Sequence, residues 1–135
     1  MTHYSELDTP AVLIDLDRAE SNLKKAQDAA DKAGIALRPH IKTHKLPFFA
    51  KKQVELGAVG ITVQKLGEAE VMADAGLTDL LLTFNIVGAA KLKRLQALHG
   101  RVTIRTVADS PECVTGLAHA FNNAEHRLGV FVECD

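Results

Sequence analysis

Residues 79–108 read DLLLTFNIVGAAKLKRLQALHGRVTIRTVA, and this segment predicts the unit from which the fold is built. An apolar run over 79–84 and a second one over 101–108 each have the length and composition of a strand buried on both faces. Between them, leucines recur at the spacing of one helix face: Leu92, Leu95 and Leu98. A helix that joins two strands of one sheet favours a parallel arrangement, so the segment predicts a parallel βα unit.

The same unit recurs along the chain. Strands are expected at Ala11–Asp15, Ile35–Lys42, Gly60–Lys65, Asp79–Phe84, Arg101–Ala108 and Leu128–Asp135. A doubly wound open sheet and a (β/α) barrel both satisfy this pattern. Nucleotide binding is disfavoured, because neither the glycine-rich dinucleotide motif nor a P-loop occurs.

Helix ends are predicted from local side-chain chemistry. Ser, Asp and Pro favour the first positions of a helix, whereas Gly favours the position after its end. The expected signals are an Asp17 cap with Glu20 three residues later, a stop at Gly34, Pro47 in a first turn, a stop at Gly76, and a start at Ser110-Pro111-Glu112.

Composition narrows the class of protein. The 135 residues are 47% hydrophobic and 24% charged, and 16 basic against 17 acidic side chains leave a net charge of −1. This balance gives no overall attraction to nucleic acid. No apolar run is long enough to span a bilayer and residues 1–8 are polar, so we expect no membrane association and a cytoplasmic location. Cys113 and Cys134 are expected to be packing residues.

The length fits a single domain, 1–135, or part of a larger one. The chain ends on the apolar run 130–135, which leads us to expect an incomplete barrel.

The stretch Arg38-Pro39-His40-Ile41-Lys42-Thr43-His44-Lys45 carries the strongest chemical signal. On a strand, Arg38, His40 and Lys42 would share one face, which suits an anion such as phosphate and a nucleophilic lysine. The alternatives are a solvated strand end and a nucleic-acid patch, although aromatic residues are scarce. A zinc site is disfavoured because His40 and His44 would lie about 13 Å apart on a strand.

Four segments together resemble the start of the D-threonine aldolase and D-serine dehydratase family: Asp8–Ala11, Asp15–Asp17, Arg38–Lys45 and Gln64–Glu70. These are fold-type III pyridoxal-phosphate enzymes related to alanine racemase, and the resemblance covers essentially the whole chain. It implies a partial (β/α)8 TIM barrel, the alanine racemase-like N-terminal domain, with about five barrel strands. It also places residues 11–15 in a separate C-terminal β domain that is otherwise absent here.

The resemblance implies a site as well. Lys42 would hold pyridoxal 5'-phosphate as a Schiff base and act as a catalytic base, with His40 beside the cofactor ring. His44, Gln64 and Asn85 are further candidate cofactor contacts. Loop solvation remains an alternative for Gln64, and a turn role remains one for Asn85.

We therefore expect the N-terminal part of a pyridoxal-phosphate lyase acting on D-β-hydroxy amino acids, by retro-aldol cleavage or by elimination. The resemblance implies that this part alone is inactive, that the protein can form a homodimer, and that none of these residues binds a metal. A divalent metal is expected only in the missing C-terminal domain. A non-catalytic pyridoxal-phosphate carrier and a short α/β interaction protein are the alternatives.

Overall fold

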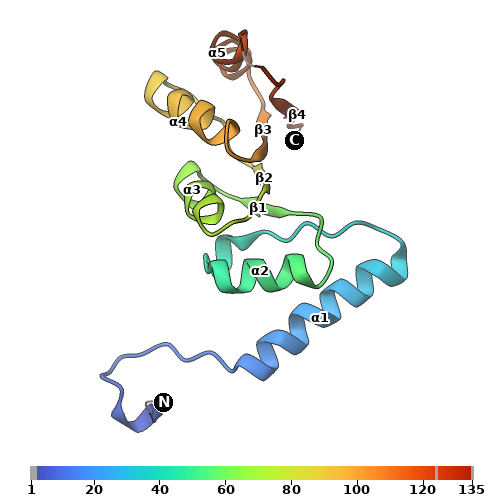
Figure 1. Ribbon diagram of the computed structural model, residues 1–135, viewed down its shortest axis with the longest axis vertical. Coiled ribbons are helices and arrows are strands. Elements are labelled where there is room, and N and C mark those ends of the chain that lie inside the picture. Colours follow the sequence, from blue (N-terminus) through green and yellow to red (C-terminus); the bar gives the residue numbers. More distant parts are fainter. Residues whose placement is uncertain (1–2, 124, 135) are drawn as a thin grey trace.

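The computed structural model describes residues 3–123 and 125–134, which form an α/β fold around one parallel sheet (Figure 1). The sheet has the order β1-β2-β3-β4, and its strands are Ile61–Val63, Asp79–Leu82, Thr103–Ala108 and Gly129–Val132. The α-helices are α1 Leu16–Ala33, α2 Pro47–Glu55, α3 Leu66–Asp74, α4 Ala89–His99 and α5 Pro111–Phe121. Two short 3₁₀ helices, η1 Tyr4–Glu6 and η2 Ile41–Thr43, complete the described elements.

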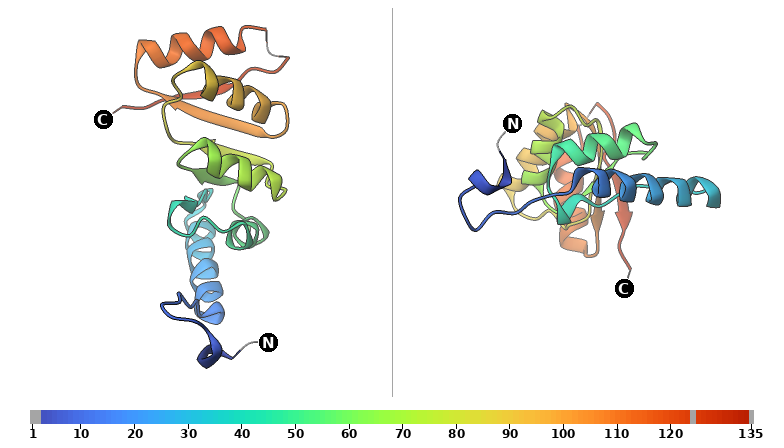
Figure 2. Two further views of the ribbon diagram at one scale, coloured as in Figure 1. Left: turned by 90° about the vertical axis from the view of Figure 1, so that its left-hand side faces the viewer. Right: turned by 90° about the horizontal axis from the view of Figure 1, so that it is seen from below.

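Neighbouring strands follow one another in the sequence, and one helix joins each pair. Leu80 of β2 pairs in register with Ile61 of β1 and with Ile104 of β3. The helix between two parallel strands must cross over the sheet, and α3 and α4 lie on the same side of it (Figures 1 and 2). The parallel βα repeat is therefore confirmed.

The core lies between this side of the sheet and its helices. Leu80 and Leu82 of β2 are completely buried, as is Leu95 of α4, while Leu98 is nearly so. Leu92 is partly buried against the same cluster. The leucine stripe predicted from the sequence is thus the face that α4 presents to the sheet.

The predicted strand Ile35–Lys42 is wrong in extent. Only His40 makes a bridge, to Thr62 of β1, and the backbone N–H of Thr62 donates to the Pro39 carbonyl at 2.8 Å. Pro39 has no backbone N–H that could donate to β1, and η2 begins at Ile41, so the ladder cannot extend. The segment still lies beside β1, where the first of the five expected barrel strands would be.

The predicted strand Ala11–Asp15 is also wrong for this structure. These residues are exposed and form no ladder with any other described residue. The Asp15 side chain accepts the N–H of Arg18 at 3.0 Å and so caps α1. The cap predicted at Asp17 is therefore misplaced by two residues, because Asp17 already lies in the first helical turn.

The remaining helix ends agree with the predictions. Gly34 follows α1 in the left-handed conformation with φ of 67°, Pro47 opens α2, and Gly76 follows the Ala75 cap of α3. Ser110 accepts the N–H of Cys113 at 3.4 Å and caps α5. These signals succeed because each depends on residues within one helical turn.

Cys113 is buried in the core, as expected of a packing residue. Cys134 is exposed, so the same prediction is wrong for that residue. Among residues 3–123 and 125–134, no helix combines the length and apolar character needed to cross a lipid bilayer.

Candidate functional site

The C-terminal ends of β1 and β2 bring three polar side chains together beside the edge segment. His40 Nε2 lies 3.2 Å from Gln64 Oε1 and 3.4 Å from Thr83 Oγ1. The Gln64 amide donates to the Thr83 carbonyl at 3.4 Å, and the Thr83 hydroxyl lies 3.3 Å from the Val63 carbonyl. We call His40, Gln64 and Thr83 the rim cluster.

The hydrogen bonds of the rim cluster indicate the tautomer and the orientation of the His40 ring. His40 Nδ1 accepts the backbone N–H of Lys42 at 3.2 Å, so a neutral ring carries its proton on Nε2. That proton faces Gln64 Oε1, whose amide nitrogen is already engaged as a donor. Both edges of the imidazole are thus occupied, and the ring is held in one orientation.

Lys42 follows directly, in the 3₁₀ turn η2. Ile41 is completely buried in the core and anchors the turn, while the Lys42 side chain is exposed. Within the described part of the chain, no ion pair or side-chain hydrogen bond engages the Lys42 ammonium. The turn therefore presents an uncommitted primary amine at the C-terminal edge of the sheet.

His44 faces α2 instead of the rim cluster. Its Nδ1 accepts the N–H of Leu46 at 3.0 Å, and its ring packs edge-on against Phe49, with the ring centroids 5.7 Å apart. Burial lowers the pKa of His44, and the nearby Gln53 side chain offsets part of that effect. His44 is therefore placed to support the turn.

Asn85 lies three residues beyond β2 and is half-buried. Its side-chain oxygen is buried and has no hydrogen-bond partner among the described residues. Most buried polar atoms in proteins have a partner. An unsatisfied acceptor at this edge of the sheet fits a bound molecule that carries a donor.

A buried carboxylate that the sequence did not single out ties the turn to β1 and α3. Glu68 is 7% exposed, forms an ion pair with Lys45 through Oε1, and accepts the backbone N–H of Gln64 through Oε2 at 2.8 Å. Burial acts to raise the pKa of Glu68, but Lys45 and the Gln64 N–H outweigh it and lower the pKa below the usual range.

Sequence reasoning missed Glu68, because its partner Lys45 lies 23 residues away along the chain and no local spacing pairs the two.

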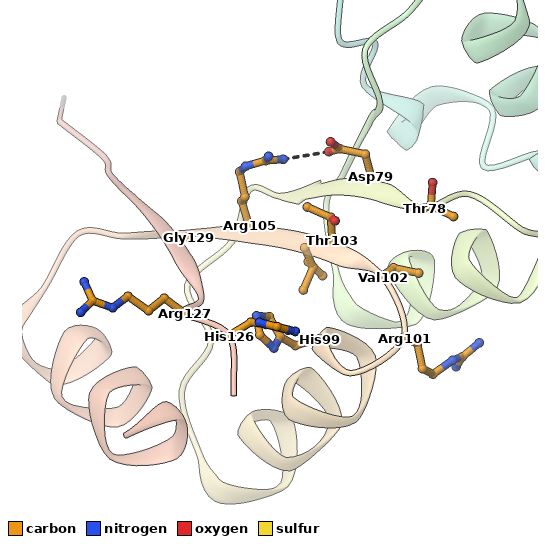
Figure 3. Close-up of a pocket in the computed structure, with 11 residues that line it drawn as sticks. Thr78, Asp79, His99, Arg101, Val102, Thr103, Arg105, His126, Arg127 and Gly129 are labelled. Atoms are coloured by element: carbon orange, nitrogen blue, oxygen red, sulfur yellow. Dashed lines mark hydrogen bonds and ion pairs between the residues drawn. The ribbon is translucent and has the colours of Figure 1, made fainter. Parts of the chain in front are cut away.

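Arg38 does not share the environment of Lys42. It forms an ion pair with Asp79 at 2.9 Å near the N-terminal end of β2, and Arg105 of β3 binds the same carboxylate oxygen at 2.9 Å. Figure 3 shows Arg105 and Asp79 pointing toward one another. Both residues line a hollow of about 690 Å³, as do His99 and Arg127. The single cationic face expected for residues 38–45 is thus wrong, because the chain turns at Ile41.

No group of three His, Cys, Asp or Glu side chains within residues 3–123 and 125–134 is arranged to bind a metal ion.

Comparisons with known proteins agree with the fold. The chain is 37% identical over 131 residues to a D-threonine aldolase from Arthrobacter sp, covering 97% of this chain and 35% of the relative. It is 36% identical over 129 residues to a D-threo-3-hydroxyaspartate dehydratase from Delftia sp. strain HT23, covering 96% and 34%. The chain thus spans about a third of the length of the relatives that it matches.

Solved structures give the same result. A D-threonine aldolase from Filomicrobium marinum superposes with a TM-score of 0.93 at 40% identity, covering 98% of this chain and 36% of that one. An alanine racemase-like protein from Idiomarina loihiensis gives a TM-score of 0.86 at 32% identity, covering 97% and 35%. The model of the alanine racemase N-terminal domain matches residues 14–135, which confirms the resemblance drawn from the sequence. The chain therefore belongs to the alanine racemase N-terminal domain family.

Proposed function

We propose that Lys42 holds pyridoxal phosphate as a Schiff base, in a protein that acts as a lyase on D-β-hydroxy amino acids. The observation that carries this proposal is the exposed Lys42 amine beside the rim cluster, at the C-terminal ends of parallel strands. Active sites of (β/α) barrels gather at that end. The names of the relatives, aldolases and a dehydratase, support the class of reaction.

The residues present fit such a cofactor. A Schiff base needs an accessible lysine, and the Lys42 side chain is exposed without an ion-pair partner in the described part of the chain. Bound pyridoxal phosphate would supply an electron sink that stabilises negative charge at the substrate Cα. Asn85 offers a buried oxygen that lacks a hydrogen-bond donor.

Each side chain of the site has a separate role in this proposal. His40 has both ring edges occupied, so a bound cofactor would meet its ring face and not a free nitrogen. Gln64 orients His40, since its amide is already engaged on both sides. Asn85 accepts a hydrogen bond from the bound molecule, and His44 supports the turn from the side of α2.

Lys42 is also the proposed base. As a free amine near the substrate Cα, Lys42 would accept the proton that elimination removes from Cα. Retro-aldol cleavage instead requires a base at the substrate hydroxyl. Because the relatives include both aldolases and a dehydratase, the proposal covers both reactions. We further propose that the substrate is a small D-amino acid and that a divalent metal binds outside these residues. The protein is proposed to form a homodimer in the cytoplasm, and residues 1–135 alone are proposed to give no turnover.

Borohydride trapping tests the proposal directly. The complete gene product would be incubated with pyridoxal phosphate, reduced, digested and analysed by mass spectrometry. We expect the phosphopyridoxyl group on Lys42 and its loss in Lys42→Ala, with Lys45 unmodified in both. Reduction that leaves Lys42 unlabelled in folded protein would refute the proposal.

Turnover assays separate a lyase from a carrier. With a divalent metal present, D-threonine or D-3-hydroxyaspartate should be consumed by the complete gene product and not by residues 1–135 alone. Labelling of Lys42 without turnover in the complete gene product would favour a non-catalytic carrier.

A further inference from the structure

The turn that carries Lys42 is held at two points. On its N-terminal side, Ile41 is completely buried in the core. On its C-terminal side, the N–H of Lys45 returns to the Ile41 carbonyl at 2.8 Å, and the Lys45 side chain forms an ion pair with Glu68. Lys42 lies between these points, so the placement of its amine depends on both.

Lys45 adopts an unusual backbone conformation in doing so. Its φ is 55°, in the left-handed region, where a residue with a side chain is disfavoured by about 1 kcal/mol. Such a conformation persists only when surrounding contacts favour it. The contact formed by the Lys45 side chain is the ion pair with Glu68, which draws the end of the turn toward α3.

Glu68 links this contact to the rim cluster. Its second oxygen accepts the backbone N–H of Gln64, and the Gln64 side chain contacts His40. The His40 ring in turn accepts the Lys42 N–H. One buried carboxylate thus fixes the turn on one side of Lys42 and the residue that orients His40 on the other.

We propose that Glu68 and Lys45 are positioning residues, which hold the Lys42 amine where it condenses with the aldehyde of the cofactor. The inference rests on the proposed function. It goes further in assigning a role to an ion pair that contacts neither the cofactor nor the substrate.

A purely structural role would be expected to act on stability alone. The Lys45 side chain is 54% exposed but the Glu68 side chain is only 6% exposed, so losing the pair also lowers stability. Positioning is therefore distinguished from a purely structural role by the rate of Schiff-base formation in variants that remain folded. Misplacing a reactive group by about 1 Å costs on the order of a hundredfold in rate.

Three variants of the complete gene product test the inference. Lys45→Asn removes the ion pair while keeping a residue that tolerates the left-handed region, Glu68→Gln removes the charge of the partner, and Lys45→Arg restores a cation. The matched control is Glu70→Gln. Glu70 lies on α3, as Glu68 does, but its ion pair is with Arg94 of α4 and does not involve the turn.

The rate of Schiff-base formation at Lys42, followed by its visible absorption band after addition of pyridoxal phosphate, is the main readout. We expect Lys45→Asn and Glu68→Gln to slow it by about tenfold or more, and Lys45→Arg and Glu70→Gln to leave it within about twofold of the wild type. The pH midpoint of the absorption band should move in the first two variants and not in the control.

Thermal unfolding of each apoprotein separates positioning from folding. Lys45→Asn should lose some stability but remain folded at the temperature of the Schiff-base assay. If Glu68→Gln unfolds early, Lys45→Asn decides the question. The inference is overturned if Lys45→Asn forms the Schiff base at the wild-type rate, or if Glu70→Gln slows it equally. A wild-type protein that forms no Schiff base at Lys42 would instead refute the proposed function.

Discussion

Replacing Gly60 with alanine is expected to lower the free energy of unfolding by about 2.5 to 4.5 kcal/mol, because the new methyl group has no space. A Cβ built at Gly60 would lie 2.2 Å from Nη1 of Arg38 and 2.7 Å from the backbone carbonyl oxygen of Asp79. Both distances are well inside van der Waals contact. The first neighbour is a side chain that can move, but the second is the backbone of β2.

Two costs make up this magnitude. Gly60 has a φ of 149°, where a residue with a side chain is strained by about 1 to 3 kcal/mol. Moving Arg38 away breaks its 2.9 Å contact with the Asp79 carboxylate, and a hydrogen bond between charged groups contributes about 1.5 kcal/mol at the low end of its range. The low end applies because both side chains are partly exposed.

Urea unfolding of the complete gene product, followed by circular dichroism, measures the effect. Gly34→Ala is the matched control: its φ of 67° is also positive, but a Cβ there would meet no atom within 4 Å. It should cost only about 1 kcal/mol. If Gly60→Ala loses no more stability than Gly34→Ala, the close approach of Arg38 and Asp79 to Gly60 is not what requires glycine, and the reasoning fails.

Three further predictions concern stability. Leu80→Ala should lower the free energy of unfolding by about 3 kcal/mol, because it leaves a cavity in a completely buried site, whereas the exposed Val12→Ala should change it by less than about 0.5 kcal/mol; equal effects in urea titrations would contradict the described core. Ser110→Ala should cost about 1 kcal/mol through the lost cap of α5, and an unchanged urea midpoint would show that the cap is dispensable. Because the pKa of Glu68 is lowered in the folded state, its carboxylate should stabilise the fold at pH values above the pKa of a glutamate in the unfolded chain. This stabilisation should be lost as the pH falls through the pKa of the folded state, so the stability of Glu68→Gln should fall less steeply at acid pH. A variant whose stability falls in parallel with the wild type would refute the linkage.

Most helix ends and the leucine stripe of α4 were predictable because they depend on neighbours within one turn, although the cap of α1 lies at Asp15 and not at Asp17. The segment around Lys42 was not predictable, although its residues were singled out. The expected alternation of side chains between two faces assumes an unbroken strand ladder, but Pro39 has no backbone N–H to contribute to it. His40 then accepts the Lys42 N–H and turns the chain at Ile41, which separates Arg38 from the lysine.

The candidate site was predictable in part. His40 and Gln64 were both expected near the cofactor, and the structure brings their side chains together, whereas His44 lies on the side of α2. Their cofactor contacts, and that of Lys42, remain predictions. Glu68 was missed, since nothing near it in the sequence shows that Lys45 lies against it.

Sequence alone determined the parallel βα repeat and most of the predicted helix ends, because apolar periodicity and capping act over short distances along the chain. The motifs around Lys42 gave the family resemblance. Only the tertiary structure decided that Asp79 serves both Arg38 and Arg105, and that Glu68 is buried against Lys45. Whether a carboxylate is solvated or paired depends on which distant strand or turn folds against it, and that is set by the register of the sheet.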